Sequence, residues 1–179
     1  MNKEFIRLSG MLCAITLVAA LLLAGVNKLT EKRILLATQQ ASEESMQKLI
    51  PEAESFRKVN ETVFEGKRKN KVAGYCVNVA PAGFAGTIEM MVGFSFEGEL
   101  LGIDILQSSE TAGLGAKADD DSFKMQFKGK STELTVQKSK TENKNEIQAI
   151  TGATITSRAV AEGVRLASEE LKKIKGGNI

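Results

Sequence analysis

The feature that most constrains this chain is an uncharged apolar run near its beginning. Between Arg7 and Lys28 the sequence reads LSGMLCAITLVAALLLAGVN, without one charged residue. A helix rises about 1.5 Å per residue, so about 20 residues cross a hydrocarbon core of roughly 30 Å. A cleaved signal peptide is the alternative, but the run is longer than the usual ~7–15-residue apolar region and no convincing small-x-small cleavage site follows it. We therefore expect residues 1–30 to form an N-terminal transmembrane anchor. Basic residues flank the run on both sides, so charge alone does not set its orientation.

Charge and residue types narrow the chemistry of the remaining chain. The chain has 24 basic and 22 acidic residues, and beyond residue 33 it has 19 basic and 20 acidic ones. The basic field that binds phosphate backbones is therefore missing, and no nucleic acid is expected as a partner. The chain has no His, and its two cysteines, Cys13 and Cys76, lie far apart in the sequence. These facts argue against a metal site, a disulfide framework and a His-activated nucleophile. We expect no catalytic side chain, and a cofactor must supply any difficult chemistry.

The rest of the chain predicts an α+β domain. Residues 31–53 indicate a stalk or capping helix that Pro51 ends, and residues 54–179 form the globular domain. Alternation predicts strands in SFRKVNETVFEG, in VAGYCVNVAP, in the pair TIEMMVGFSFEGELLGIDILQS and in STELTVQKS. SFKMQFKGK predicts a short helix, and SRAVAEGVRLASEELKKIKGG a long final helix capped by Ser157. We expect an antiparallel-type sheet packed with helices, preceded by one transmembrane helix.

The first motif that can carry chemistry is TGATITSRAV, residues 151–160. Its small residues leave the backbone bare, and its hydroxyls and free amides gather where the final helix opens. Such a place suits a phosphate group, because the amides and the helix dipole both favour an anion. A turn of small residues that leads into a capped helix explains the same letters without any ligand. The candidate cofactor-binding residues are Thr151, Gly152, Ala153, Thr154, Thr156 and Ser157.

The second motif is SSETAGLGAKADDDSFKMQFKGK, residues 108–130. Its glycines permit close backbone approach to a flat ring, and Leu114 offers an apolar surface. Taken alone, the segment is better explained as a solvated turn, with Asp119 to Asp121 as its polar end. Its candidate cofactor-binding residues are Glu110, Thr111, Gly113, Leu114 and Gly115.

Together the two motifs resemble those of a known family. TGATITS resembles the S/T-G-A-T flavinylation motif of FMN-binding domains, which occur in the G subunit of the Rnf electron-transport complex and in the C subunit of the Na⁺-translocating NADH:quinone reductase. The second segment resembles the family's E-T-P-G-L-G stretch and the phenylalanine-containing stretch that ends in G-K after it. The order of the motifs and the single anchor favour the Rnf G subunit. The matching positions of the second segment are Glu110, Thr111, Gly113, Leu114, Gly115, Phe123, Phe127, Gly129 and Lys130.

The resemblance implies a function. FMN would be joined through a phosphoester to Thr154, the last Thr of the motif, by a dedicated flavin transferase that uses FAD as donor. The chain would relay electrons in an ion-translocating ferredoxin:NAD oxidoreductase complex of the cell membrane. Its FMN domain would be extracytoplasmic, and the other membrane subunits would be its partners. Gln148 stands where the family commonly has an Asp that bears on the transferase, and Ala112 stands where it has Pro. A non-catalytic scaffold and a stand-alone extracytoplasmic FMN-binding electron carrier are the alternatives.

Overall fold

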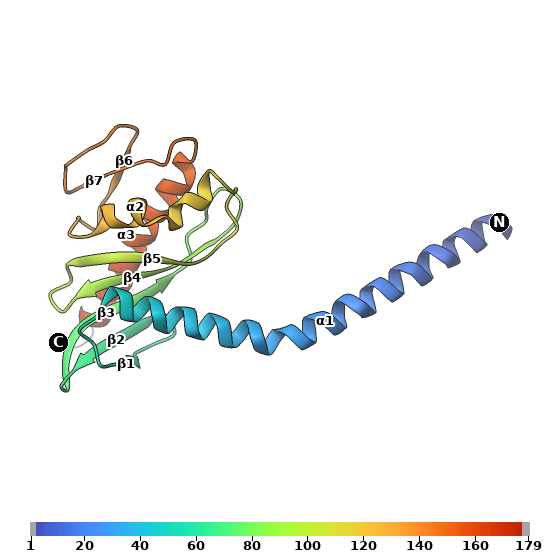
Figure 1. Cartoon of the computed structure of the whole chain (residues 1–179), viewed down its shortest axis with the longest axis horizontal. Coiled ribbons are helices and arrows are strands. Elements are labelled where there is room, and N and C mark those ends of the chain that lie inside the picture. Colours follow the sequence, from blue (N-terminus) through green and yellow to red (C-terminus); the bar gives the residue numbers. More distant parts are fainter. Residues whose placement is uncertain (1–2, 177–179) are drawn as a thin grey trace. The chain divides into compact units, whose positions relative to one another are not determined.

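The first of two structural units contains the apolar helix. The structure, a computed structural model, describes residues 3–176, and the chain divides into Met1–Gln40 and Ala41–Ile179. The first unit is occupied by helix α1 (Lys3–Leu49), which also contributes its last residues to the second unit (Figure 1). Phe5–Glu31 is long and apolar enough to cross a membrane, with a mean hydropathy of 2.3, and none of it is buried in the protein. This segment therefore has the length and composition of a membrane span.

A five-stranded antiparallel sheet forms the centre of the second unit (Figure 1). Each strand pairs with the next along the chain, so the sheet is a meander. The predicted strand pair that flanks residues 96–99 is present, and Gly98 adopts a positive φ of 99° in its turn. The strands are β1 (Ser55–Lys58), β2 (Val63–Arg68), β3 (Lys71–Val79), β4 (Ile88–Ser95) and β5 (Leu100–Ser108).

Helix α3 (Thr154–Gly176) packs on one face of this sheet, against β3 and β4. Val160 and Val164 on its inner side are completely buried in the main hydrophobic core. Burying each such side chain contributes about 1.5–3 kcal/mol. Gly163 lets the helix approach closely, because a Cβ at this position would lie 2.5 Å from Sδ of Met90. The sheet with its packed helices confirms the predicted α+β fold.

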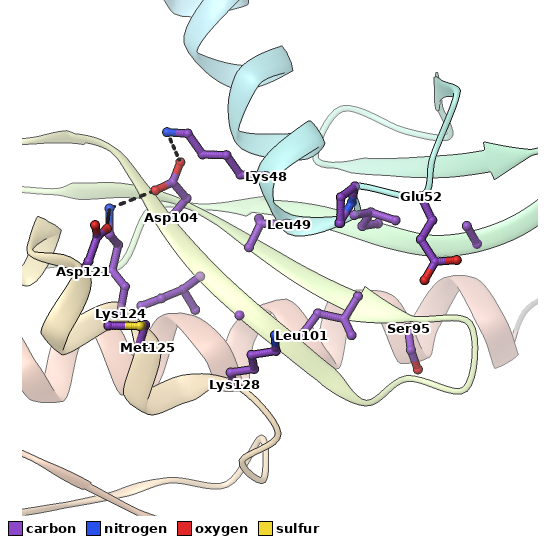
Figure 2. A pocket seen from close by; sticks show the side chains of 15 residues that line it. Lys48, Leu49, Glu52, Ser95, Leu101, Asp104, Asp121, Lys124, Met125 and Lys128 are labelled. Atoms are coloured by element: carbon purple, nitrogen blue, oxygen red, sulfur yellow. Dashed lines mark hydrogen bonds and ion pairs between the residues drawn. The ribbon is translucent and has the colours of Figure 1, made fainter.

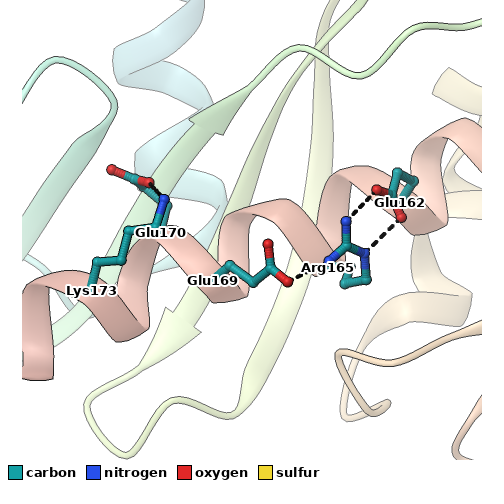
Figure 3. A network of polar contacts seen from close by, with 5 residues as sticks. All are labelled: Glu162, Arg165, Glu169, Glu170 and Lys173. Carbon is teal, nitrogen blue, oxygen red and sulfur yellow. Dashed lines mark hydrogen bonds and ion pairs between the residues drawn. The ribbon is translucent and has the colours of Figure 1, made fainter.

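The outer side of α3 is charged (Figure 3). Arg165 forms ion pairs with Glu162 and Glu169, and Lys173 pairs with Glu170 at 3.0 Å. The pairs are three or four residues apart, which brings side chains together along one helix face. Exposed pairs of this kind contribute only a few tenths of a kcal/mol each, so the solvated side of α3 adds little to stability.

The opposite face of the sheet receives the end of α1. Leu49 lies over Gly93, where an added Cβ would come within 2.9 Å of the Cβ of Leu49. The buried Asp104 of β5 pairs with Lys48 of α1 at 3.6 Å and with Lys124 at 3.1 Å (Figure 2). Lys124 belongs to the short helix α2 (Asp121–Lys124), so one carboxylate joins two helices to the sheet. A groove of about 740 Å³ opens beside this carboxylate. Basic and acidic side chains line it, among them Lys48, Lys124, Glu52 and Asp121.

The segment after β5 carries short helices along that edge strand. They are η1 (Gly115–Asp119), α2 and η2 (Met125–Phe127). Phe123 and Phe127 lie on one side of this segment, with their rings edge to face and their centroids 5.4 Å apart, and both are buried.

A small second sheet leads the chain back to α3. It consists of β6 (Thr135–Gln137) and β7 (Glu146–Gln148), which run parallel. The side-chain amide of Gln126 binds the backbone of Gln148 at both of its polar atoms: Nε2 donates to the carbonyl at 3.4 Å and Oε1 accepts from N–H at 2.8 Å. These bonds attach the end of β7 to η2, six residues before Thr154.

Candidate functional site

A cavity of about 400 Å³ lies at the beginning of α3 and brings the two sequence motifs together. Its size falls within the range of roughly 300–1,000 Å³ that is usual for sites of small ligands and cofactors. Motif residues that are distant in the sequence supply most of its wall. The lining residues are Phe84, Glu110, Thr111, Leu114, Gly115, Gly152, Ala153, Thr154, Ile155 and Thr156.

A tight turn before α3 sets the floor of the cavity. Gly152 has a φ of +80°, which glycine adopts without strain. A Cβ there would lie 3.0 Å from Cδ2 of Leu114, so the small residue also lets the two motifs touch. Ala153 closes the turn by donating its N–H to the carbonyl of Ile150 at 2.9 Å.

Thr154 is the first residue of α3, and its half-buried side chain lines the cavity. The amides of the first turn have no acceptor within the helix, and the positive end of the helix dipole lies here. An anion at this end is favoured by both effects. The first helical bond of α3 comes later, from N–H of Ser157 to the carbonyl of Ala153.

Ser157 is not the N-cap, which corrects the sequence-based prediction. The helix begins three residues earlier, because the turn at Gly152 already directs the chain into it. The hydroxyl of Ser157 is fully buried, donates to the carbonyl of Ala153 at 2.9 Å and accepts from N–H of Ile150 at 2.9 Å. Ser157 thus stabilises the turn from the inside and does not line the cavity.

Two other predicted residues also lie outside the cavity lining. Thr151 is exposed and lines a separate, shallow cleft together with Gln148. Gly113 is exposed and has a φ of +76°, with nothing within 4 Å of an added Cβ. The turn geometry therefore accounts for the glycine at 113. The remaining predicted residues, from Glu110 to Thr156, are brought together.

Glu110 is the most strongly hydrogen-bonded side chain of the cavity. Its Oε1 accepts from the backbone amides of Phe84 at 2.6 Å and Ala85 at 3.0 Å, and its Oε2 accepts from the Thr156 hydroxyl at 2.6 Å. Burial alone would raise the pKa of this carboxyl. The hydrogen bonds from Thr156, Ala85 and Phe84 outweigh burial, so the pKa of Glu110 lies below its usual value. The group is therefore ionised at neutral pH.

Two lining residues were missed from the sequence, and both are apolar and exposed. The side chain of Phe84 is 67% exposed and that of Ile155 is 55% exposed, and they share the rim with Leu114. Phe84 lies in the tight turn Gly83–Gly86, which a bond from N–H of Gly83 to the carbonyl of Gly86 closes at 2.7 Å. The sequence does contain one indication of Phe84, because it is a large aromatic residue in a turn of otherwise small residues.

Comparison with known proteins identifies relatives of this chain. The FMN-binding domain family matches residues 83–169, which contain both motifs and the turn with Phe84. The chain is 37% identical to the G subunit of the proton-translocating ferredoxin:NAD(+) oxidoreductase complex of Clostridium ljungdahlii, over 89% of this chain and 88% of that one. It is 38% identical to the G subunit of the Na(+)-translocating ferredoxin:NAD(+) oxidoreductase complex of Acetobacterium woodii, over 92% and 90%.

Two crystal structures share the fold. The C subunit of the Na(+)-translocating NADH-quinone reductase of Parabacteroides distasonis superposes with a TM-score of 0.53 at 26% identity, covering 62% of this chain and 60% of that one. NqrC of Shewanella oneidensis gives 0.52 at 22% identity, covering 58% and 53%.

Proposed function

Because the chain belongs to the family of G subunits of ion-translocating ferredoxin:NAD⁺ oxidoreductase (Rnf) complexes, we propose that it is a membrane-anchored flavoprotein that relays electrons through one FMN. The observation that carries this proposal is the cavity at the start of α3, which both motifs line. When bound, FMN supplies transfer of one or two electrons, and the protein sets its potential through contacts and hydrogen bonds.

The residues of the cavity suit the two ends of FMN. Phe84, Leu114 and Ile155 present apolar surface at the rim, which favours a flat aromatic ring. The free amides at the start of α3 and the hydroxyl of Thr154 favour the phosphate. Among residues 3–176 no Lys or Arg lines the cavity, so the helix end is the source of positive potential for the phosphate.

Thr154 is the proposed attachment point. Its backbone is held in the first turn of α3, while its side chain borders the cavity, so a group on Oγ1 would be fixed at the cavity wall. By family resemblance, a flavin transferase would join the FMN part of FAD to Oγ1, with loss of the Thr154 hydroxyl proton and departure of AMP as the phosphorus–oxygen bond to it breaks. The residue serves once, during maturation, and takes no part in turnover.

The partners and placement follow from the same family. We propose that residues 1–30 anchor the chain in the cell membrane, that residues 31–53 form a stalk, and that the domain of residues 54–179 is extracytoplasmic. In this position the flavin would exchange electrons with redox centres of the other membrane subunits of the complex. The candidate span Phe5–Glu31 supports anchoring, and its length admits a single crossing.

Intact-protein mass spectrometry tests the proposal. The full chain, co-expressed with a flavin transferase, is expected to gain the mass of one FMN less one water and to fluoresce after denaturing electrophoresis. Thr154→Ala should abolish both signals. Thr151→Ser is the matched control, because it keeps the S/T position of the motif and Thr151 does not line the cavity. A processed wild-type chain that loses all flavin on denaturation would exclude the covalent bond, and unimpaired electron transfer by a complex carrying Thr154→Ala would favour a scaffold.

A further inference from the structure

Glu110 is buried, and both of its carboxylate oxygens accept hydrogen bonds from other residues of the protein. Oε1 accepts from the amides of Phe84 and Ala85, and Oε2 accepts from the hydroxyl of Thr156. Only 8% of the residue is exposed, and none of the ion pairs found among residues 3–176 involves it. The charge is therefore stabilised by hydrogen-bond donors and by the positive end of α3, and not by a neighbouring cation.

Two glycines let the backbone close around this carboxylate. A Cβ at Gly83 would lie 2.3 Å from Oε1 of Glu110, and a Cβ at Gly115 would lie 2.4 Å from Oε2. The Cβ at Gly115 would also come within 2.9 Å of Oγ1 of Thr156. Any side chain at either glycine would displace the carboxylate. Three separate segments thus fit around one charged group: the turn that carries Phe84, the start of η1, and the start of α3.

We propose that Glu110 is a positioning residue for the flavin, which joins the walls of the cavity and holds one negative charge beside it. The flavin-dependent part of this inference rests on the proposed function, whereas the joining of the walls does not. Because three hydrogen bonds occupy the carboxylate, Glu110 acts through the placement of Phe84 and Thr156 and through its charge. A negative charge beside the ring opposes the uptake of an electron, so Glu110 lowers the reduction potential of the bound flavin.

Two variants separate the hydrogen bonds from the charge. Glu110→Ala removes both. Glu110→Gln keeps the shape, because its carbonyl oxygen accepts from both amides and its NH₂ group donates to the Thr156 hydroxyl. Glu169→Gln, on the outer side of α3, is the control for a change in net charge alone.

The first measurement uses the full chain, purified without the flavin transferase. Amide hydrogen exchange at Phe84 and Ala85 is expected to rise about tenfold or more in Glu110→Ala, since hydrogen bonds to a charged group are lost. Glu110→Gln is expected to restore most of the protection. Exchange in Glu110→Ala that equals the wild-type rate would overturn the role of Glu110 in joining the walls.

The second measurement uses protein loaded by the transferase. Potentiometric titration of loaded Glu110→Gln is expected to give a reduction potential above that of wild type and of Glu169→Gln, a change that a purely structural residue would not cause. An unchanged potential would overturn the electrostatic role. Loss of loading in Glu110→Gln with amide protection retained would make the carboxylate a direct ligand and refute positioning. If the wild-type chain carries no flavin, the proposed function fails, while the exchange rates still decide whether Glu110 joins the walls.

Discussion

Truncating two phenylalanines is expected to separate stability from function. Phe127 is completely buried between η2 and the core, whereas Phe84 is 67% exposed at the rim of the cavity. Phe→Ala at a fully buried site costs about 3–5 kcal/mol. Full burial of a large apolar side chain contributes about 1.5–3 kcal/mol, so the third of Phe84 that is covered contributes about 0.5–1 kcal/mol. With a urea m-value of about 2 kcal/mol per M, Phe127→Ala lowers the unfolding midpoint by about 2 M and Phe84→Ala by less than about 0.5 M.

The assay uses the single tyrosine of a chain that has no tryptophan. Tyr75 is buried in the main core, so its fluorescence reports unfolding of the domain in the flavin-free, detergent-solubilised protein. Flavin loading is measured separately with the transferase present, and here Phe84→Ala is expected to reduce the flavin bound per protein. A midpoint for Phe84→Ala as low as that of Phe127→Ala would refute the reasoning, because Phe84 would then be a core residue. If Phe84→Ala binds as much flavin as wild type, the proposed contact between the Phe84 side chain and FMN is wrong.

Three further outcomes follow from other residues. Burial raises the pKa of the Cys76 thiol to about 12, so alkylation of the folded, detergent-solubilised protein at pH 8 should leave Cys76 untouched until urea unfolds the domain, and peptide mass mapping would show modification of folded Cys76 if this is wrong. Gly152→Ala should destabilise the domain by about 1 kcal/mol or more, because Ala resists a φ of +80°, and a urea midpoint equal to that of wild type would contradict this. The carboxyl of Glu110 has a lowered pKa in the folded state. Its contribution to the free energy of unfolding is therefore complete above its unfolded-state pKa of about 4.3 and is lost as the pH falls through its folded-state pKa. Below about pH 4.3 the free energy of unfolding of wild type should fall more steeply with pH than that of Glu110→Gln, as urea unfolding at a series of pH values would show.

The sequence predicted those elements whose pattern repeats over enough residues. The apolar helix, the strand pair around Gly98 and the short helical segment that carries Phe123 and Phe127 all have long or well-spaced signals. β7 was missed, because three residues are too few for alternation to show. The start of α3 was placed too late, because Ser157 has the composition of a cap while its hydroxyl serves the preceding turn.

The site was predicted in its motifs but not in its contacts. The sequence alone does not predict the hydrogen bond between Glu110 and the backbone amide of Phe84. The two residues are 26 positions apart and come together only in the folded domain. Gly115 is explained by that same contact, since a Cβ there would meet the carboxylate. Local sequence therefore carries the residue types, whereas tertiary packing decides which of them face the cavity.

The meander has a consequence for the order in which the chain matures during synthesis. Each of β2 to β5 pairs with the strand before it, so the sheet can assemble strand by strand as the chain leaves the ribosome. The cavity cannot form strand by strand in this way, because the start of α3 forms one of its walls. Helix α3 is held on the sheet by core residues up to Leu171. A chain without α3 would contain the sheet but not the completed cavity. Loading with the proposed flavin would therefore depend on the synthesis and packing of α3, well after the sheet can form.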